Sequence, residues 1–107
     1  MPTVYITAPT EAASTLAHGL VEARLAACVN VIDCESVYWW GDEIETEDEV
    51  ILLAKTTDDR YEDLVEWLEV EHPYNVPCIE RFDESHVFDP YGDWVEEMVE
   101  AAESGSN

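Results

Sequence analysis

The densest group of chemically capable residues in the sequence is His72-Pro73-Tyr74, followed closely by Pro77 and Cys78. A histidine can bind a metal, transfer protons or hydrogen-bond the carbonyl groups at the end of a helix. No second histidine or cysteine lies at ligand spacing beside His72, so the sequence favours the helix-capping role for this residue taken alone. Cys78 carries a soft sulfur of the kind that copper prefers, and it is the only thiol within ten residues of His72.

Lys55 and Trp40 are two further candidates for ligand contact. Lys55 is the only lysine of the chain and stands at the end of an apolar, strand-like run. This position indicates either a specific anionic partner or a strand-end charge that reaches into solvent. Trp40 ends the aromatic triplet Tyr38-Trp39-Trp40, which predicts either packing at a hairpin tip or a stacking platform for a ligand.

A run of carboxylates separates these two residues. It consists of Glu45, Glu47, Asp48 and Glu49. Such a run is either the solvated flank of a strand or a place for hard cations such as Mg²⁺ or Ca²⁺, although no EF-hand spacing is present. The sequence also contains no glycine-rich nucleotide loop, nucleophile elbow or zinc-protease motif. It therefore shows no self-evident catalytic machinery.

Acidic residues dominate the composition. In 107 residues, 26 aspartates and glutamates stand against 4 lysines and arginines, which gives a formal net charge of −22. Hydrophobic residues still make up 47%, and this excludes a disordered acidic tail. The charge argues against nucleic acid and anionic membranes as partners, because both attract basic surfaces. Molar salt shortens the Debye length to about 3 Å and relieves the self-repulsion, so the composition predicts a salt-rich cytosol, as in a halophile.

The cysteines and the N-terminus indicate the compartment. The chain has three cysteines, an odd number, and no CxxC pair. Its first residues lack the basic region and the long apolar stretch of a signal peptide. Both observations predict a cytoplasmic protein with free thiols.

The strands that must position these residues follow from β-branched and aromatic runs. Such runs predict strands at residues 3–7, 28–40, 44–56 and 78–82, with a turn at Gly41. Consecutive strands two and three are joined by this short turn, so they predict a hairpin.

Helical spacing of apolar residues predicts three helices. The first helix begins with Thr10 as its N-cap and carries an apolar stripe from Ala13 to Ala27. The second helix follows the N-cap Thr57 and ends at His72-Pro73. The third helix begins at Asp89. The face of the third helix consists of Tyr91, Trp94, Val95, Met98, Val99 and Ala102. The order predicts an α+β, ferredoxin-like β-α-β-β-α-β fold with a C-terminal helix, as one domain over residues 1–107. Its sheet is antiparallel, with the first two helices on one face.

The central hairpin is too long for this domain. The thirteen residues Cys28 to Trp40 span roughly 43 Å when extended, whereas a compact domain of this length has a diameter of roughly 34 Å. The hairpin must therefore bend or project, and an aromatic edge left bare invites aggregation. Pairing with another subunit is the favoured solution, and a bulge that folds the ribbon back over its own sheet is the alternative.

Several motifs occur in the order and spacing of one known family. They are Thr7-Ala8-Pro9, Ala26-Ala27-Cys28-Val29-Asn30, Tyr38-Trp39-Trp40, Glu49 with Lys55-Thr56-Thr57, His72-Pro73-Tyr74 with Pro77, and Tyr91 with Trp94. Together they resemble the CutA divalent-cation-tolerance family, in a haloarchaeal-type member, from about Thr3 to Val99. The resemblance implies a tight homotrimer with PII-like architecture, built by strand pairing between subunits. It also implies a cytoplasmic protein linked to tolerance of copper and other divalent cations, with no reaction firmly attached.

The resemblance implies a site as well. A cleft between subunits would hold a metal or a small ligand, and its lining residues would be Trp40, Glu49, Lys55, His72 and Tyr74. Copper or another divalent cation would be held by His72 and Cys78. The sequence departs from the bacterial copper pattern, because Ile6 stands in place of a cysteine and Glu71 in place of the first of two histidines. Cys78 itself stands where the family usually has a glutamate.

Two other functions stay open beside the trimeric binding protein. The first is a trimeric scaffold or signalling module for a protein partner, and the second is an enzyme that uses Lys55 and Glu49 in an interface pocket. A lysine that loses its proton near neutrality would favour the enzyme. The binding protein is favoured, and the scaffold is preferred to the enzyme.

Overall fold

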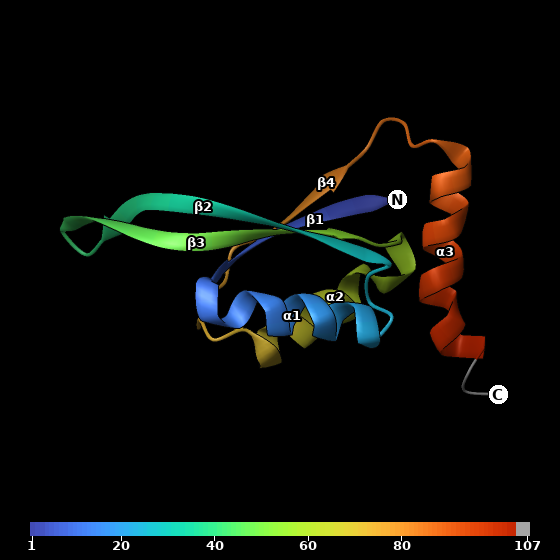
Figure 1. Ribbon diagram of the computed structural model, residues 1–107, viewed down its shortest axis with the longest axis horizontal. Helices are drawn as coiled ribbons and strands as arrows, with labels where there is room; N and C mark the ends of the chain where they lie inside the picture. The colour runs from blue at the N-terminus through green and yellow to red at the C-terminus, as the bar shows by residue number, and fades with distance from the viewer. Residues whose placement is uncertain (105–107) are drawn as a thin grey trace.

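A computed structural model describes residues 1–104, and the side chains of residues 1–100. Its elements are β1 (Pro2–Pro9), α1 (Thr10–Glu22), β2 (Cys28–Trp40), β3 (Glu43–Lys55), α2 (Asp58–Glu71), β4 (Ile79–Asp83) and α3 (Asp89–Ser104) (Figure 1). This order confirms the predicted α+β arrangement with a C-terminal helix. Of the predicted domain 1–107, the last three residues lie outside the described part of the chain, and so does the side chain of Ala102.

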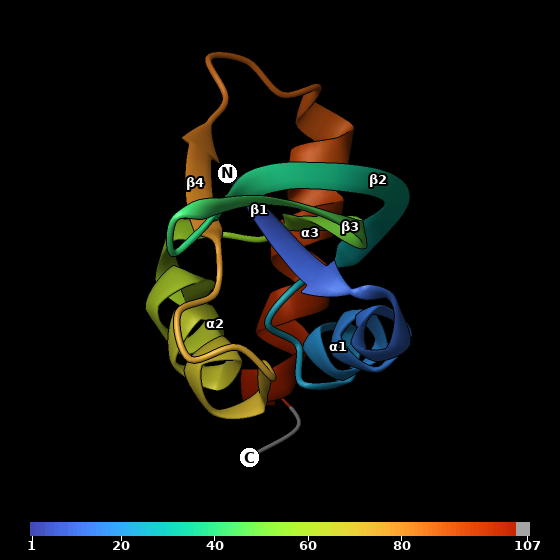
Figure 2. The same cartoon turned by 90° about the vertical axis from the view of Figure 1, so that its left-hand side faces the viewer.

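The four strands form one antiparallel sheet in the order β2-β3-β1-β4. Helices α1 and α2 lie side by side under one face of it, and the other face carries no helix (Figure 2). Within the described residues, no helix is long and apolar enough to cross a membrane. The sheet thus has one covered face, one open face and two free edges of unequal length, at β2 and β4.

Strand alternation divides the side chains between these two faces. The covered face and the helices supply the core, whose fully buried members include Val4, Ile6, Ala8, Leu20, Leu52, Ala54, Leu64 and Leu68. Their strand neighbours point to the open face, where the rings of Tyr5 and Phe82 lie in a tilted arrangement with centroids 6.0 Å apart. Any functional residue at an odd position of β1 or β3 therefore lies on the open face.

Helix α1 differs from its prediction at both ends. Pro9 is the N-cap residue, and Thr10 is already helical, with its hydroxyl bonded to the Glu11 side chain rather than to a backbone N–H. The helix ends at Glu22 and not at Ala27, because Arg24 adopts a left-handed conformation with φ of 61°. The Arg24 guanidinium donates to the carbonyl of Met98 in α3 at 3.1 Å, a tertiary contact that periodicity does not reveal.

The long hairpin projects from the domain. Its register runs without interruption from Cys28 opposite Lys55 to Trp40 opposite Glu43, and Gly41 turns the chain with φ of 62°. The molecule measures 50 × 30 × 20 Å because this ribbon extends well beyond the helices (Figure 1). The alternative of a bulged ribbon folded over its own sheet is therefore wrong.

Helix α3 stands across the end of the sheet that is remote from the hairpin tip (Figure 1). Val95 and Val99 are buried there, and Arg60 donates to the Val99 carbonyl at 3.0 Å. Tyr91 and Trp94, which were predicted to belong to the same buried face, are instead exposed, with their rings 5.8 Å apart. Since α3 meets only the edge of the domain, one fully buried residue per helical turn, Val95 and then Val99, suffices for its packing.

Candidate functional site

The root of the hairpin, formed by Pro9, Cys34 and Glu49, is the position at which candidate residues meet. Glu49 lies opposite Pro9 of β1 on one side and opposite Cys34 of β2 on the other. Strand β1 ends here, so only β2 and β3 continue beyond this point, and they form the hairpin that projects from the domain. By strand alternation Glu49 points to the open face of the sheet.

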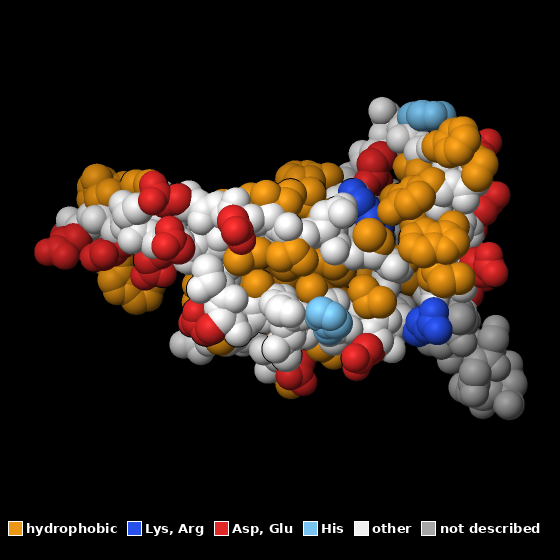
Figure 3. Space-filling view, viewed as in Figure 1, with side chains coloured by type: hydrophobic (Ala, Val, Ile, Leu, Met, Phe, Trp, Pro, Cys, Tyr) orange, Lys and Arg blue, Asp and Glu red, His pale blue; other side chains and the backbone are white. Residues whose placement is uncertain are grey.

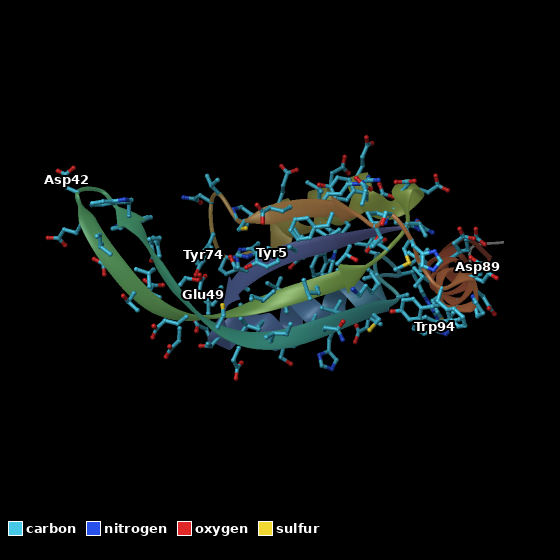
Figure 4. All side chains as sticks on the ribbon, turned by 90° about the horizontal axis from the view of Figure 1, so that it is seen from above. Tyr5, Asp42, Glu49, Tyr74, Asp89 and Trp94 are labelled. Carbon is cyan, nitrogen blue, oxygen red and sulfur yellow. The ribbon has the colours of Figure 1, made fainter. Side chains whose placement is uncertain are left out.

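Glu49 is nearly buried, with 7% of its surface exposed, although it carries a carboxylate. The hydroxyl of Tyr74, from the segment after α2, donates to its Oε2 at 2.9 Å. Figure 4 looks onto the open face and shows Tyr5, Glu49 and Tyr74 close together, with Asp42 at the distant tip. The structure thus brings two of the residues named as candidates, Glu49 and Tyr74, into direct contact.

The environment of Tyr74 holds its phenol in the neutral form. Burial is the main cause that raises its pKa, followed by the hydrogen bond to Glu49 and the negative charges of Glu49 and Glu47. A phenol in this state donates its hydrogen to Glu49 and cannot act as an anionic ligand at neutral pH.

We expect Tyr74→Phe to lower the free energy of unfolding by about 2 kcal/mol at neutral pH, because it removes a hydrogen bond to a buried carboxylate. The raised pKa of Tyr74 means that folding favours the protonated phenol. Its contribution is therefore complete below the ordinary phenol pKa of about 10 and is lost as the pH rises through the folded-state pKa. The difference in thermal midpoint between the wild type and the variant should shrink above about pH 10.

The matched control is Tyr61→Phe, at the opposite end of α2 from Tyr74. This variant removes the same hydroxyl group from a ring that lies against the Arg81 guanidinium rather than Glu49, so it leaves the bond to Glu49 intact. A difference between wild type and Tyr74→Phe that stays constant through the alkaline range would contradict the proposed bond.

His72 lies beside Tyr74 but does not play the capping role that the sequence favoured. Its backbone N–H bonds to the Leu68 carbonyl and closes α2, whereas its ring leaves the helix and contacts β1. Nε2 lies 2.8 Å from the Thr7 carbonyl oxygen, and Nδ1 receives the Tyr74 backbone N–H at 3.1 Å. The ring is only 6% exposed, so these two backbone groups occupy both nitrogens.

Cys78 approaches the same strand from the other side. Its side chain is hydrogen-bonded to that of Thr7, whose carbonyl His72 contacts. Burial is the main cause that raises the pKa of the Cys78 thiol, and the charge of Glu80 adds to it, so the protonated thiol is favoured.

Copper therefore does not fit the donors around His72. Backbone groups engage both imidazole nitrogens of His72, and the Cys78 side chain is hydrogen-bonded to Thr7. Within the described residues, no three histidine, cysteine, aspartate or glutamate side chains gather as a metal cluster. The remaining acceptors at the hairpin root are oxygens, chiefly the Glu49 carboxylate, and oxygen ligands suit hard divalent cations.

Lys55 and Trp40 lie far from Glu49 within one chain. Lys55 is six residues from Glu49 on β3, roughly 20 Å away at about 3.4 Å per residue. Its Nζ donates to the Thr3 hydroxyl at 3.4 Å, and Thr3 in turn donates to Glu84. Trp40 is 72% exposed at the hairpin tip, opposite Glu43. A single chain thus cannot join Lys55 and Glu49 in one catalytic pair.

The structure adds Tyr5 and Thr7 to the residues around the site. Burial is the main cause that raises the pKa of Tyr5, and the negative charges of Glu80 and Glu49 add to it. Tyr5 therefore lies close to two carboxylates, those of Glu80 and Glu49. Period-two alternation over residues 3–7 is the signal that could have placed both residues on this face.

Comparisons with known proteins find sequence relatives that match nearly the whole chain. The sequence model of the family described as CutA1 divalent ion tolerance protein matches residues 2–98. The divalent-cation tolerance protein CutA of Thermus thermophilus is 42% identical over 96 residues, which are 88% of this chain and 93% of the relative.

Solved structures agree with the sequence comparison. The crystal structure of CutA from Pyrococcus horikoshii superimposes with a TM-score of 0.89 at 38% identity, covering 92% of this chain and 98% of that one. A structure from Archaeoglobus fulgidus, described as a periplasmic divalent cation tolerance protein, gives a TM-score of 0.88 at 34% identity, with coverages of 92% and 99%. The fold and the length of the chain are therefore those of these proteins.

Proposed function

The chain belongs to the CutA1 divalent ion tolerance family, and from this premise we propose that it is a homotrimeric binding protein of divalent-cation tolerance. Its ligand is a divalent cation, or the cationic group of a small molecule, held at the hairpin root where subunits meet. We place it in the cytoplasm, which accords with its three free cysteines.

The observation that carries this proposal is the buried Glu49 carboxylate. Within the described residues, no lysine or arginine forms an ion pair with it, and Tyr74 supplies a neutral donor. A buried carboxylate is costly unless a positive charge or several donors compensate it. A bound cation, or the Lys55 of a neighbouring copy, would supply that charge.

The surface of the hairpin supports assembly. The hairpin side that is continuous with the covered face of the sheet carries Val37, Trp39 and Ile44, which are 64%, 69% and 62% exposed. The opposite side carries Trp40 with Glu43, Glu45 and Glu47. Figure 3 shows both apolar and acidic side chains near the tip. An apolar ribbon side that its own chain leaves bare indicates an interaction surface.

Assembly would also explain why the predicted lining is dispersed. Trp40 and Lys55 lie at opposite ends of the strands from one another, with Glu49 between them. A cleft lined by all three therefore needs residues from more than one copy. This accords with the free β2 and β4 edges, which can pair with strands of other subunits.

Calorimetric titration with Mn²⁺ in about 1 M KCl tests the site, because Mn²⁺ prefers oxygen ligands and molar salt screens loose surface binding. We expect saturable binding in the wild type and at least a tenfold loss of affinity in Glu49→Gln, which removes the charge but keeps the shape. The matched control is Glu47→Gln, on the same side of the same strand but exposed, and its affinity should stay within about twofold.

Two results of this titration would contradict the proposal. Equal Mn²⁺ binding in the wild type and in Glu49→Gln would place the ion elsewhere. An absence of saturable binding in all three proteins would remove the divalent cation as the ligand of this site.

A further inference from the structure

His72 connects the end of α2 and the turn that follows it to β1, 65 residues earlier in the sequence. Its backbone N–H donates to the Leu68 carbonyl at the end of α2, at 2.8 Å. Its ring contacts Thr7, one residue beyond Ile6, where the pairing of β1 with β4 stops. The same ring contacts the backbone of Tyr74, two residues further along the chain.

The partners of the ring define its chemical state. A carbonyl oxygen can only accept, so Nε2 must carry the hydrogen that bonds to Thr7. A backbone N–H can only donate, so Nδ1 must offer its lone pair to Tyr74. His72 is therefore a neutral imidazole in the Nε2–H form, and its one lone pair is already used.

A metal ion needs that same lone pair. Coordination by His72 would have to displace the Tyr74 amide, inside a site where the ring is 6% exposed. The displaced N–H would then lose its partner in a partly buried position, which is costly.

The bonds of His72 also determine where Tyr74 points. Pro73 restricts the backbone between the two residues, and the two rings lie with centroids 5.0 Å apart. From this fixed turn the Tyr74 hydroxyl reaches Glu49 at 2.9 Å. Loss of the ring would release the turn and, with it, the only side-chain donor that the described residues give Glu49.

We infer that His72 is a positioning residue and not a metal ligand: its neutral ring fixes the His72-Pro73-Tyr74 turn and so holds the Tyr74 hydroxyl against Glu49. This inference rests on the proposed function, because it assigns the arrangement of the same site. It reverses the metal role that the family resemblance implied for His72 and leaves Cys78 without its partner ligand.

The first test is nitrogen NMR of the histidine rings in the ¹⁵N-labelled wild type. We expect the His72 signals of a neutral Nε2–H tautomer, unchanged when stoichiometric Zn²⁺ or Cu(I) is added. His18 and His86, which are exposed, serve as internal controls for loose metal binding. An Nδ1–H tautomer, or a metal-induced change of the His72 signals at stoichiometric metal, would overturn the inference.

The second test compares His72→Asn with His72→Leu. Asparagine places an oxygen near the position of Nδ1 and can still accept the Tyr74 N–H, whereas leucine cannot. We expect the Tyr74 amide to exchange its hydrogen about tenfold faster in the leucine variant and to stay protected in the asparagine variant. The amide of buried Leu52 is the control for global opening.

Equal protection of the Tyr74 amide in wild type and leucine variant would overturn the inference, and so would equal loss in both variants. If His72→Leu does not fold, the wild-type tautomer and its response to metal decide the question. The tautomer of the metal-free wild type and the exchange of the Tyr74 amide are both measured without Mn²⁺ or any other added ligand of Glu49. These experiments can therefore exclude the positioning role of His72 while the proposed binding site is retained. The Mn²⁺ titration can likewise exclude the binding site while the positioning role is retained.

Discussion

Lowering the KCl concentration from about 1 M to about 0.1 M should reduce the thermal midpoint of this protein by on the order of 20 °C. The cause is the net charge of −22 in 107 residues. The Debye length grows from about 3 Å to about 10 Å over this range, so carboxylates on neighbouring strands and helices begin to repel one another. A loss of several kcal/mol in a domain of this size corresponds to such a shift.

The few cations are already engaged and cannot offset this repulsion. Arg81 pairs with Asp58 and Asp83, while Arg24 donates to a backbone carbonyl of α3. These arginines do not compensate the negative charge of the hairpin, since they lie at the opposite end of the molecule from its tip. Scanning calorimetry in KCl, with sucrose at equal osmolality as the control for solvent exclusion, measures the effect. A midpoint that does not depend on KCl, or that sucrose restores fully, would contradict the proposed adaptation to salt.

Val37→Glu should convert the assembled protein into a monomer. The Val37 side chain is 64% exposed in one chain, so its replacement costs the isolated fold little. In a trimer the same position would lie in the interface, where an unpaired carboxylate costs several kcal/mol, and the cost recurs in every copy. We therefore expect a threefold fall in particle mass at micromolar concentration, with an unchanged circular dichroism spectrum.

Glu47→Gln on the other side of the hairpin is the control and should keep the full mass. This variant also changes a charge on the ribbon, but it leaves the apolar side intact. Retention of the assembled mass by Val37→Glu would show that the apolar side of the hairpin faces solvent. In that case the scaffold hypothesis, with this side available to another protein, would replace assembly as its explanation.

The sequence predicted those features that depend on neighbours along the chain or on strand length. β-Branched and aromatic runs such as residues 3–7 were sufficient to predict the strands, and thirteen residues from Cys28 to Trp40 were sufficient to predict a hairpin that outgrows its domain. Helix ends were less predictable. The end of α1 depends on Arg24, whose left-handed backbone is accompanied by a bond to α3, 74 residues away.

In the candidate site, too, the sequence predicted some features and not others. Tyr74 and Glu49 were both named as candidates, yet their contact joins residues 25 apart and no periodicity predicts it. The prediction for His72 was wrong about the ring, because its partner is the Thr7 carbonyl of a strand 65 residues earlier. Chemical type identified the candidates, and tertiary structure decided which of them meet.

Multi-angle light scattering of the wild type in about 1 M KCl is the most direct test of the central claim, that the site at the hairpin root is completed by neighbouring copies. A homotrimer predicts a particle of three times 12.1 kDa at micromolar concentration. A monodisperse particle of 12.1 kDa would contradict it, because Trp40 and Lys55 could then never approach Glu49.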